Sequence, residues 1–590
     1  MASAPRVLGT LGRQTRLVDP RDGDIETDAS STESRSLLAL AGNLLAEVSL
    51  LKMAAAFVSL VVIPAVLIGL VPVIVTIWVR TLSSGRPGVG GIGGIFIIVV
   101  LLTLAWFGGR SLLRVAERSF WSLNAMAIQP GYVTWREALL HVSGRVIGRH
   151  ADEAKEARVR AAASALSGIM ICVISLVIIR LVWPATHWVG TLNDLRTPHW
   201  LALTAIANAV AVGFAYLAVA GLIWGFADAT MPQPRELRDF RVKRELKRTW
   251  RVAHMSDIHV VGEKYGFRLG SGRAGPRGND ALVAAFQRLD ELHRREPLDA
   301  IVITGDLTDA GTSAEWAELL DIFERFPRLT PLMVALPGNH DVNIVDRSNP
   351  ARLDLPTSPK KRLREVRTIS ALASIQGTHV RVIDGDRHCV GDTIDHTLAP
   401  RAPDIVAFAE GGARRLARAT DDVWVSLFPM VHPPAQDDGL GIIALNSNAE
   451  THFSFTNALG FIPLEHERAL EAAFEEYPRA YWIIALHHHI VEHPKLGHAL
   501  ADRVGTTLIN GTWFTRLIRP FGNRAVVMHG HRHIDWMGEC GGLRILSAPS
   551  ATMPSTGHDD VYFYIHTVGV DAGGRVALAT PERVDVVTAH

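Results

Sequence analysis

Long apolar runs dominate the first 230 residues of the chain, and short ones dominate the remainder. Four long runs cover residues 53–79, 91–108, 162–182 and 201–226. About 20 apolar residues in a helix span the hydrocarbon core of a bilayer. The pattern therefore predicts an all-α region over residues 37–230 with four transmembrane helices. Residues 1–36 are polar and rich in Ser, Thr, Asp and Arg, which predicts a disordered cytoplasmic tail.

The charges of the connecting segments predict the orientation of these helices. Residues 1–52 carry six Lys and Arg residues, residues 110–160 carry nine and residues 229–251 carry eight, whereas the other two loops carry one or two each. By the positive-inside rule, both termini are cytoplasmic. We therefore expect a multi-pass protein of the inner (cytoplasmic) membrane. Arg180 is the single charged residue within the four runs, which favours an anchor over a transporter.

A basic linker is predicted over residues 231–248. Its Lys and Arg side chains would either contact anionic lipid headgroups or form a solvated helix face, and the sequence leaves both interpretations open.

Residues 249–590 show the alternation of a soluble α/β domain. Helical spacing occurs over 281–295 and 313–326. Strand-like apolar runs occur at 250–259, 299–306, 331–341, 441–448, 480–489, 524–533 and 543–550. This alternation predicts stacked layers with buried sheets. In such sheets, functional residues collect at the carboxyl ends of strands.

A polar cluster follows five of the predicted strands. The clusters contain Asp257 and His259; Asp306 and Asp309; Asn339, His340 and Asp341; His487, His488 and His489; and His529, His531 and His533. Carboxylate oxygens and imidazole nitrogens suit zinc, manganese and iron. Any one cluster could cap a helix or lie in a turn. Together they predict a site for two divalent metal ions (Mn, Fe or Zn), which can clamp a phosphate group.

The order of these motifs resembles a known family. D-x-H, G-D-x-x-D, G-N-H-D, a histidine after a later strand and G-H-x-H follow one another as in the calcineurin-like metallophosphoesterase superfamily, over about residues 250–555. The resemblance implies that residues 249–590 fold as a four-layer α/β/β/α sandwich. It also implies a dinuclear metal centre and hydrolysis of a phosphoester by a metal-bridging hydroxide.

The resemblance further implies a role for each site residue. One ion would be bound by Asp257, His259, Asp306 and His533, and the other by Asp306, Asn339, His487 and His531. His487 is preferred because the family's ligand most often comes first after the strand; His488 is the close alternative and His489 a weaker one. His340 would contact the phosphate and assist the leaving group, and Asp341 would orient His340. Asp309 and His529 are expected to be structural.

The substrate class is less sharply indicated. Protein phosphatases of the family usually carry Arg after the second Asp of G-D-x-x-D, where this chain has Ala310. This weighs against a protein phosphatase, and the run GDLTDAGTSAEWAELL resembles the branch of the family that includes class III cyclic-nucleotide phosphodiesterases and glycerophosphodiesterases. We therefore expect a phosphodiesterase; the membrane anchor favours a lipid-linked substrate, and a cyclic nucleotide is the other candidate. The alternatives are a phosphomonoesterase and a catalytically inactive membrane signalling or scaffold protein.

An insertion over residues 343–437 lengthens the domain. Its segments 358–367 and 407–419 would form a substrate-selecting cap or a membrane-facing surface. The net charge of +1 does not indicate a nucleic-acid partner, and three widely separated cysteines do not predict a disulfide-linked partner. The expected partners are the phosphoester substrate and membrane lipids.

Overall fold

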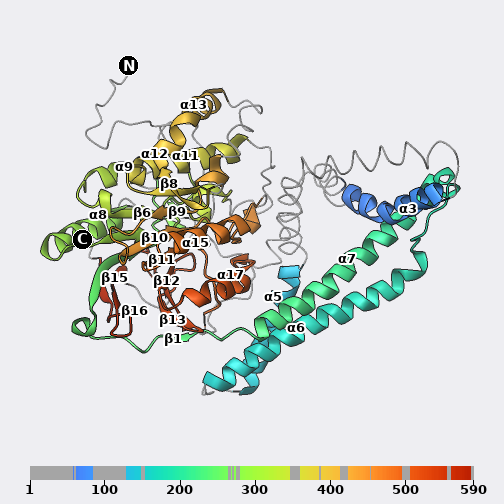
Figure 1. Cartoon of the computed structure of the whole chain (residues 1–590), viewed down its shortest axis with the longest axis horizontal. Coiled ribbons are helices and arrows are strands. Elements are labelled where there is room, and N and C mark those ends of the chain that lie inside the picture. The colour runs from blue at the N-terminus through green and yellow to red at the C-terminus, as the bar shows by residue number, and fades with distance from the viewer. Residues whose placement is uncertain are drawn as a thin grey trace. The chain divides into compact units, whose positions relative to one another are not determined.

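The computed structural model describes residues 58, 62–83, 128–147, 153–262, 267–268, 272–273, 279–345, 359–384, 387–411, 423–451, 454–493, 505–554 and 560–586. They form two compact units, one within Glu47–Met231 and the other within Pro232–His498 and Gly505–His590 (Figure 1).

The first unit is helical. It contains α3 (Ile63–Ser83), α5 (Gln129–Ile147), α6 (Glu153–Val182) and α7 (Pro198–Ala229). The segments Lys155–Ala185 and Pro198–Ala229 are long and apolar enough to cross a membrane, by length and composition, and Ala65–Arg80 is a shorter apolar helix. The predicted runs 162–182 and 201–226 therefore lie in helices, and 53–79 overlaps α3. The predicted run 91–108 lies outside the described residues.

The second unit contains two mixed sheets. The six-stranded sheet has β2, β5 and β6 side by side and parallel. Its strands are β16 (Val576–Leu578), β15 (Tyr562–Val570), β2 (Arg248–Met255), β5 (Ala300–Ile303) and β6 (Met333–Ala335), with β17 (Glu582–Asp585) paired to β15. A separate hairpin joins β3 (Phe267–Arg268) and β4 (Gly272–Arg273).

The larger sheet has nine strands, of which β10, β11, β12 and β14 run parallel. In spatial order they are β1 (Arg235–Glu236), β13 (Trp536–Cys540), β14 (Leu543–Ser547), β12 (Ala525–His529), β11 (Tyr481–Ala485), β10 (Leu440–Ala444), β9 (Met430–His432), β7 (Arg381–Asp384) and β8 (Cys389–Thr393).

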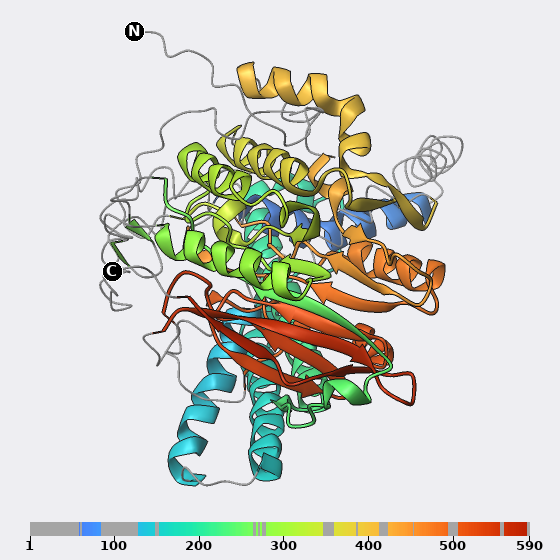
Figure 2. The ribbon, with the colours of Figure 1, turned by 90° about the vertical axis from the view of Figure 1, so that its left-hand side faces the viewer.

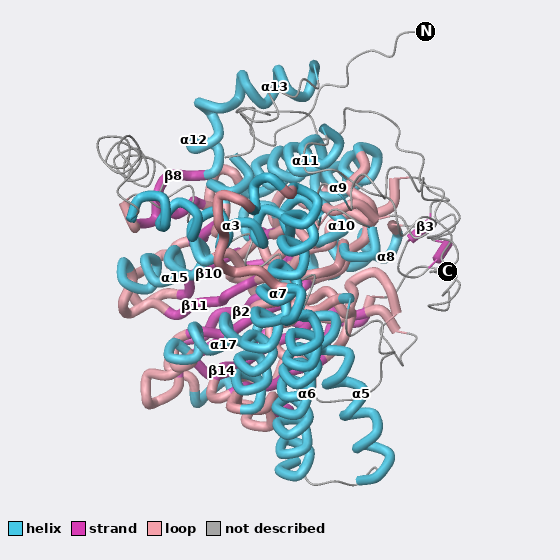
Figure 3. Tube along the Cα trace, turned by 90° about the vertical axis from the view of Figure 1, so that its right-hand side faces the viewer, coloured by secondary structure: helices cyan, strands magenta, loops and turns pink. Residues whose placement is uncertain are grey.

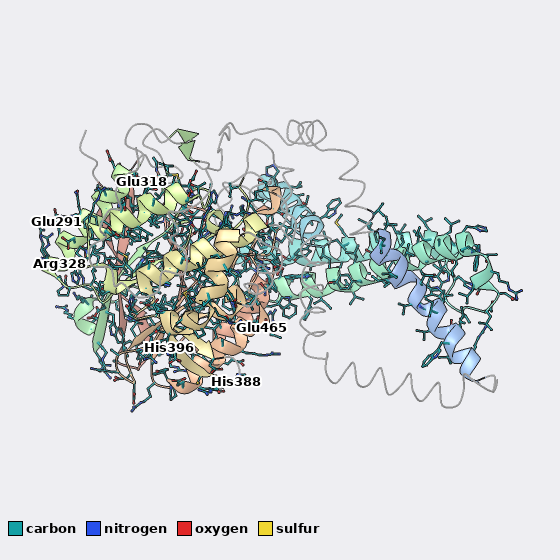
Figure 4. The ribbon with its side chains drawn as sticks, turned by 90° about the horizontal axis from the view of Figure 1, so that it is seen from above. Glu291, Glu318, Arg328, His388, His396 and Glu465 are labelled. Carbon is teal, nitrogen blue, oxygen red and sulfur yellow. The ribbon has the colours of Figure 1, made fainter. Side chains whose placement is uncertain are left out.

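Helices cover both sheets. They include α8 (Asp280–Arg295), α9 (Ser313–Glu324), α10 (Asn339–Val342), α11 (Pro359–Gln376), α12 (Ile394–Leu398), α13 (Ala402–Gly411), α15 (Leu464–Glu476) and α17 (Gly511–Ile518). The strands lie inside this unit, with α8, α9 and α11 on one side and α15 and α17 on the other (Figures 2 and 3). On the outer faces of α8 and α9, Glu291 and Glu318 point away from the sheets (Figure 4).

The strand period explains how the layers pack. Successive side chains of a strand point to opposite faces of the sheet. In β11, Ile483 and Ala485 belong to the same core as Val252 and Ile301 of the smaller sheet. Trp482 instead packs edge-on against Phe474 of α15, with ring centroids 5.8 Å apart. The two sheets with their helices are consistent with the predicted metallophosphoesterase sandwich.

The predicted linker 231–248 is part of this unit. Residues of β1 pair antiparallel with β13, and the buried Leu237 belongs to the main core. Several of its basic side chains pair with acidic residues of the same unit: Arg235 with Glu539, Lys243 with Glu296 and Arg248 with Asp438. The prediction of a separate linker is therefore wrong. The local pattern could not show this, because the strand and ion-pair partners of the segment lie more than 50 residues away in the sequence.

Candidate metal centre

Five loops bring their polar residues to one place in the second unit. Parallel strands end at the same edge of a sheet, so the loops after β2, β5 and β6 lie together, as do those after β11 and β12. Three groups of possible ligand atoms result, each with its atoms within 4.8 Å of one another. They are Asp257, His259 and His533; His259, Asp306 and His340; and Asp306, His487 and His531.

Asp306 lies at the centre of these groups. Its Oδ2 is 3.6 Å from His259 Nε2 and 3.3 Å from His487 Nε2. Around a tetrahedral ion with bonds of 2.0–2.1 Å, neighbouring ligand atoms lie about 3.3 Å apart. The spacing on both sides of Asp306 therefore fits a carboxylate shared between two ions.

The remaining predicted ligands complete the two sides. On the first side, His533 Nε2 lies 3.2 Å from His259 Nε2 and 3.3 Å from Asp257 Oδ1. On the second side, His487 Nε2 lies 3.1 Å from Asn339 Oδ1 and 3.1 Å from His531 Nδ1. Oxygen and imidazole donors in this arrangement fit a dinuclear site for zinc, manganese or iron.

The backbone at these positions is unusual. Five of the predicted ligands have left-handed φ angles: Asp257 (51°), His259 (47°), Asp306 (49°), His531 (74°) and His533 (50°). Asp and His enter this region more readily than most residues, but each such residue still costs free energy. Strain of this kind clusters at functional sites, where the surrounding structure enforces it.

Two glycines allow the loops to approach one another. A Cβ on Gly338 would lie 2.1 Å from Asp306 Oδ1, and one on Gly530 would lie 1.8 Å from Ser256 Oγ and 2.4 Å from Asp257 Oδ2. Any larger residue would therefore displace a predicted ligand. The lack of space explains why glycine occupies these positions in G-N-H-D and G-H-x-H.

His340 lies beside the cluster and is held by Asp309. Its ring centroid is 4.5 Å from that of His259, edge to face. The Nδ1 of His340 lies 2.6 Å from the main-chain carbonyl of Asp309. A carbonyl only accepts hydrogen bonds, so Nδ1 carries the proton and Nε2 is the atom available to a substrate.

The expected contact from Asp341 to the His340 ring is replaced by a different arrangement. The Asp341 carboxylate accepts hydrogen bonds from the amides of Gly338, Leu307 and Thr308 and from the Thr308 hydroxyl. Asp341 therefore joins the G-N-H-D loop to the G-D-x-x-D loop and acts on His340 through the backbone. The group that orients the His340 ring is the main-chain carbonyl of Asp309. The motif alone could not show this, because it also offers the Asp341 carboxylate next to His340.

Asp309, which was expected to be structural rather than catalytic, has a second contact at the site through its side chain. Its Oδ1 lies 3.1 Å from His259 Nδ1, while His259 Nε2 faces Asp306. A carboxylate behind a metal-ligating histidine fixes the ring and its tautomer. The second Asp of G-D-x-x-D was the available sequence signal.

Ser447 is a further supporting residue without a sequence signal. Its hydroxyl oxygen accepts hydrogen bonds from the amides of His487 and His488 and lies 2.9 Å from His488 Nδ1. These contacts fix the turn that directs His487 towards Asp306. His488 is fully buried beside His531, with ring centroids 4.3 Å apart. His529 is also buried, and its Nδ1 lies 3.3 Å from the Gly530 carbonyl.

The electrostatics favour an ionised central carboxylate. Burial acts to raise the pKa of Asp306, but the surrounding histidines, led by His487, outweigh burial and hold the pKa well below its usual range. Burial acts to lower the pKa of His487, and Asp306 outweighs it in turn, raising the pKa. Burial and the Asp306 charge raise the pKa of Asp341 to about 6. Two cations at this site would meet an anionic donor.

The insertion contributes a core helix beside the site. In α11, Val366, Ile369 and Leu372 belong to the main core, and Lys361, Arg364 and Arg367 are buried. The Arg364 Nε donates to the Val342 carbonyl, and the Thr368 hydroxyl donates to the Asp341 carbonyl. Segment 358–367 is therefore packed against the loop that carries His340, which contradicts a membrane-facing surface for its described residues. Segment 407–419 lies largely outside the described residues.

Comparison with known proteins agrees with this geometry. The model of the calcineurin-like phosphoesterase family matches residues 251–535. No curated protein matches the chain. A solved Staphylococcus aureus protein assigned as a 5'-nucleotidase, in complex with alpha-ketoglutarate, is 12% identical, with a TM-score of 0.32 over 58% of this chain and 55% of that one.

Two further solved structures are similar at the same slight level. GAP50, described as the anchor in the inner membrane complex of Plasmodium, is 11% identical, with a TM-score of 0.30 over 58% of this chain and 90% of that one. The Thermus thermophilus sulfate thiohydrolase SoxB in complex with glycerol is 11% identical, with a TM-score of 0.28 over 60% of this chain and 58% of that one. This chain thus spans little more than half of the first and third proteins. The family match and the clustered ligands identify residues 251–535 as a calcineurin-like phosphoesterase domain.

Proposed function

We propose that this chain is a membrane-anchored phosphodiesterase with two divalent metal ions in a cytoplasmic active site. The observation that carries the metal assignment is Asp306 Oδ2, which lies between His259 and His487. One ion would be bound by Asp257, His259, Asp306 and His533. The other would be bound by Asp306, Asn339, His487 and His531.

A bound metal pair supplies an activated water nucleophile at neutral pH and offsets charge on the phosphoryl group. The chain's own residues orient the substrate and supply the proton. His340 directs Nε2 towards the substrate because the Asp309 carbonyl holds Nδ1. When the ring is an imidazolium, with both nitrogens protonated, Nε2 can donate a hydrogen bond to a phosphoryl oxygen and pass its proton to the leaving oxygen, which returns the ring to the neutral Nδ1–H form. Asp341 keeps its loop in register with Asp306.

The membrane assignment rests on the helical unit. Its helices α6 and α7 expose large apolar side chains, including Leu176, Val177 and Leu181 of α6 and Leu203, Val219 and Phe226 of α7. Exposed apolar surface on a long apolar helix is what a bilayer accommodates. The loop charges support the proposal that both termini and the phosphoesterase domain are cytoplasmic.

The proposed substrate is a phosphodiester, either lipid-linked or a cyclic nucleotide. Ala310 argues against a protein phosphatase, because its position lacks the arginine that family protein phosphatases use to bind phosphate. The membrane anchor supports a substrate presented at a lipid surface. An inactive scaffold is disfavoured because Asp257 and Asp306 each belong to a group of three possible ligand atoms that lie within 4.8 Å of one another.

The test is hydrolysis by the full chain, purified in detergent with Mn²⁺. We expect faster turnover of bis-p-nitrophenyl phosphate than of p-nitrophenyl phosphate, and loss of both activities in Asp306→Asn. The matched control is His396→Gln, at an exposed histidine of α12 on the outside of the domain (Figure 4). Turnover of the monoester alone would replace the proposal with a phosphomonoesterase. Bound metal without turnover of either compound, or of lipid and cyclic diesters, would favour the scaffold.

A further inference from the structure

Arg532 lies between two predicted ligands, His531 and His533, yet its guanidinium pairs with a carboxylate on another loop. Its side chain is only 5% exposed, and Nη1 donates to Glu492 Oε2 at 3.2 Å. A buried charge requires a partner, and breaking such a pair leaves the remaining charge without compensation. The Arg532–Glu492 pair is therefore a strong constraint on the G-H-x-H loop.

Glu492 also approaches His489 with its other carboxylate oxygen. Its Oε1 lies 3.5 Å from His489 Nε2. The His489 ring is nearly parallel to that of His531, at 16°, with centroids 6.2 Å apart. Glu492 thus connects the loop after β11, which carries His487, to the loop after β12, which carries His531 and His533.

The G-H-x-H loop needs support of this kind. His531 and His533 both have left-handed φ angles, 74° and 50°. Such angles persist where the surroundings enforce them. The Asp257 carboxylate supports one end by accepting the His531 amide hydrogen at 3.0 Å. Arg532 provides the one side chain between the two histidines through which the middle of the loop is held.

We propose that Glu492 is a positioning residue for the metal centre. By holding Arg532, it keeps the loop in the conformation that directs His531 and His533 towards Asp306 and Asp257. This inference rests on the proposed function, because it requires that these histidines bind metal. Since His531 and His533 belong to different sides of the site, loss of the clamp would weaken both ions.

The test measures Mn²⁺ binding to the full chain in detergent, by equilibrium titration and by the electron paramagnetic resonance signal of the coupled ion pair. We expect Glu492→Gln and Arg532→Met to weaken binding about 10- to 100-fold, the range for residues that orient metal ligands. Arg532→Lys keeps the charge opposite Glu492 and should recover much of this loss. The matched control is Glu365→Gln, which breaks the buried Arg362–Glu365 pair of α11.

A double variant, Glu492→Leu with Arg532→Met, separates positioning from stability. It removes both charges, so its melting temperature should recover towards wild type while Mn²⁺ binding stays weak. Recovery of both, or wild-type binding by Glu492→Gln, would overturn the inference and leave the proposed function intact. A wild-type chain that binds no Mn²⁺ would overturn the proposed function and this inference with it.

Discussion

Asp309 holds two histidines of the site with two different groups. Its main-chain carbonyl lies 2.6 Å from Nδ1 of His340, and its carboxylate lies 3.1 Å from Nδ1 of His259. One residue therefore orients both a predicted metal ligand and the predicted proton donor. Because the two contacts use different atoms, substitution of the side chain can separate the two roles.

Asp309→Asn should weaken metal binding more than turnover. The amide removes the negative charge behind His259 but leaves the carbonyl that holds His340. We expect Mn²⁺ affinity to fall about 10- to 100-fold, with turnover at saturating Mn²⁺ changed much less. Titration of activity and of bound Mn²⁺ would measure both quantities. The control is Asp404→Asn on the exposed surface of α13; equal loss of turnover at saturating metal would contradict the separation.

His340→Asn should leave both metals bound and slow the reaction. General acid catalysis by a positioned side chain contributes about 10²- to 10⁴-fold. We expect the full loss with an alkyl phosphodiester, whose leaving oxygen needs a proton, and a smaller loss with p-nitrophenolate, which leaves unprotonated. The ratio of turnover for the two leaving groups is the measurement. An equal loss with both would instead assign His340 to phosphate binding.

Glycine at position 533 should stabilise the metal-free protein relative to alanine. The left-handed φ of 50° at His533 costs a non-glycine residue about 1–2 kcal/mol, and glycine avoids that cost. In the presence of a chelator, the free energy of unfolding of His533→Gly should exceed that of His533→Ala by about 1 kcal/mol. At Arg583 in strand β17 the order should reverse, because glycine weakens an extended strand. The same order at both positions would argue against strain at His533.

His466 should make the domain less stable in mild acid. Burial lowers the pKa of this α15 histidine to about 3, whereas the unfolded chain has the ordinary value near 6.5. Below pH 6.5 the unfolded state binds a proton that the folded state does not, so stability is full above that pH and falls as the pH drops towards 3. One such histidine costs about 2 kcal/mol between pH 7 and pH 5.

Urea unfolding of the full chain at the two pH values measures this dependence. His466→Leu should reduce the pH-dependent loss of stability by about 2 kcal/mol. The exposed His396→Gln should leave the loss unchanged. An unchanged loss in His466→Leu would show that other buried histidines, such as His566, carry the acid sensitivity.

The sequence by itself determined the types and positions of the metal-centre residues. Each motif directly follows an apolar strand, and the polarity switch from strand to loop is a local property. Asp257, Asp306, His487 and His533 could therefore be assigned to one sheet edge before their partners were known. The α/β layering followed from the same alternation, and helix 281–295 matches α8 closely.

Only the tertiary structure decided which residues hold the side chains of the metal centre in position. The Asp309 carbonyl replaces Asp341 behind His340, Ser447 fixes the turn at His487, and Glu492 reaches Arg532 across 40 residues. The basic segment before β2 became an edge strand because Glu539 and β13 lie beside it. These contacts depend on distance in space and on which atom of a residue is presented, and neither property is encoded in local hydrophobic spacing.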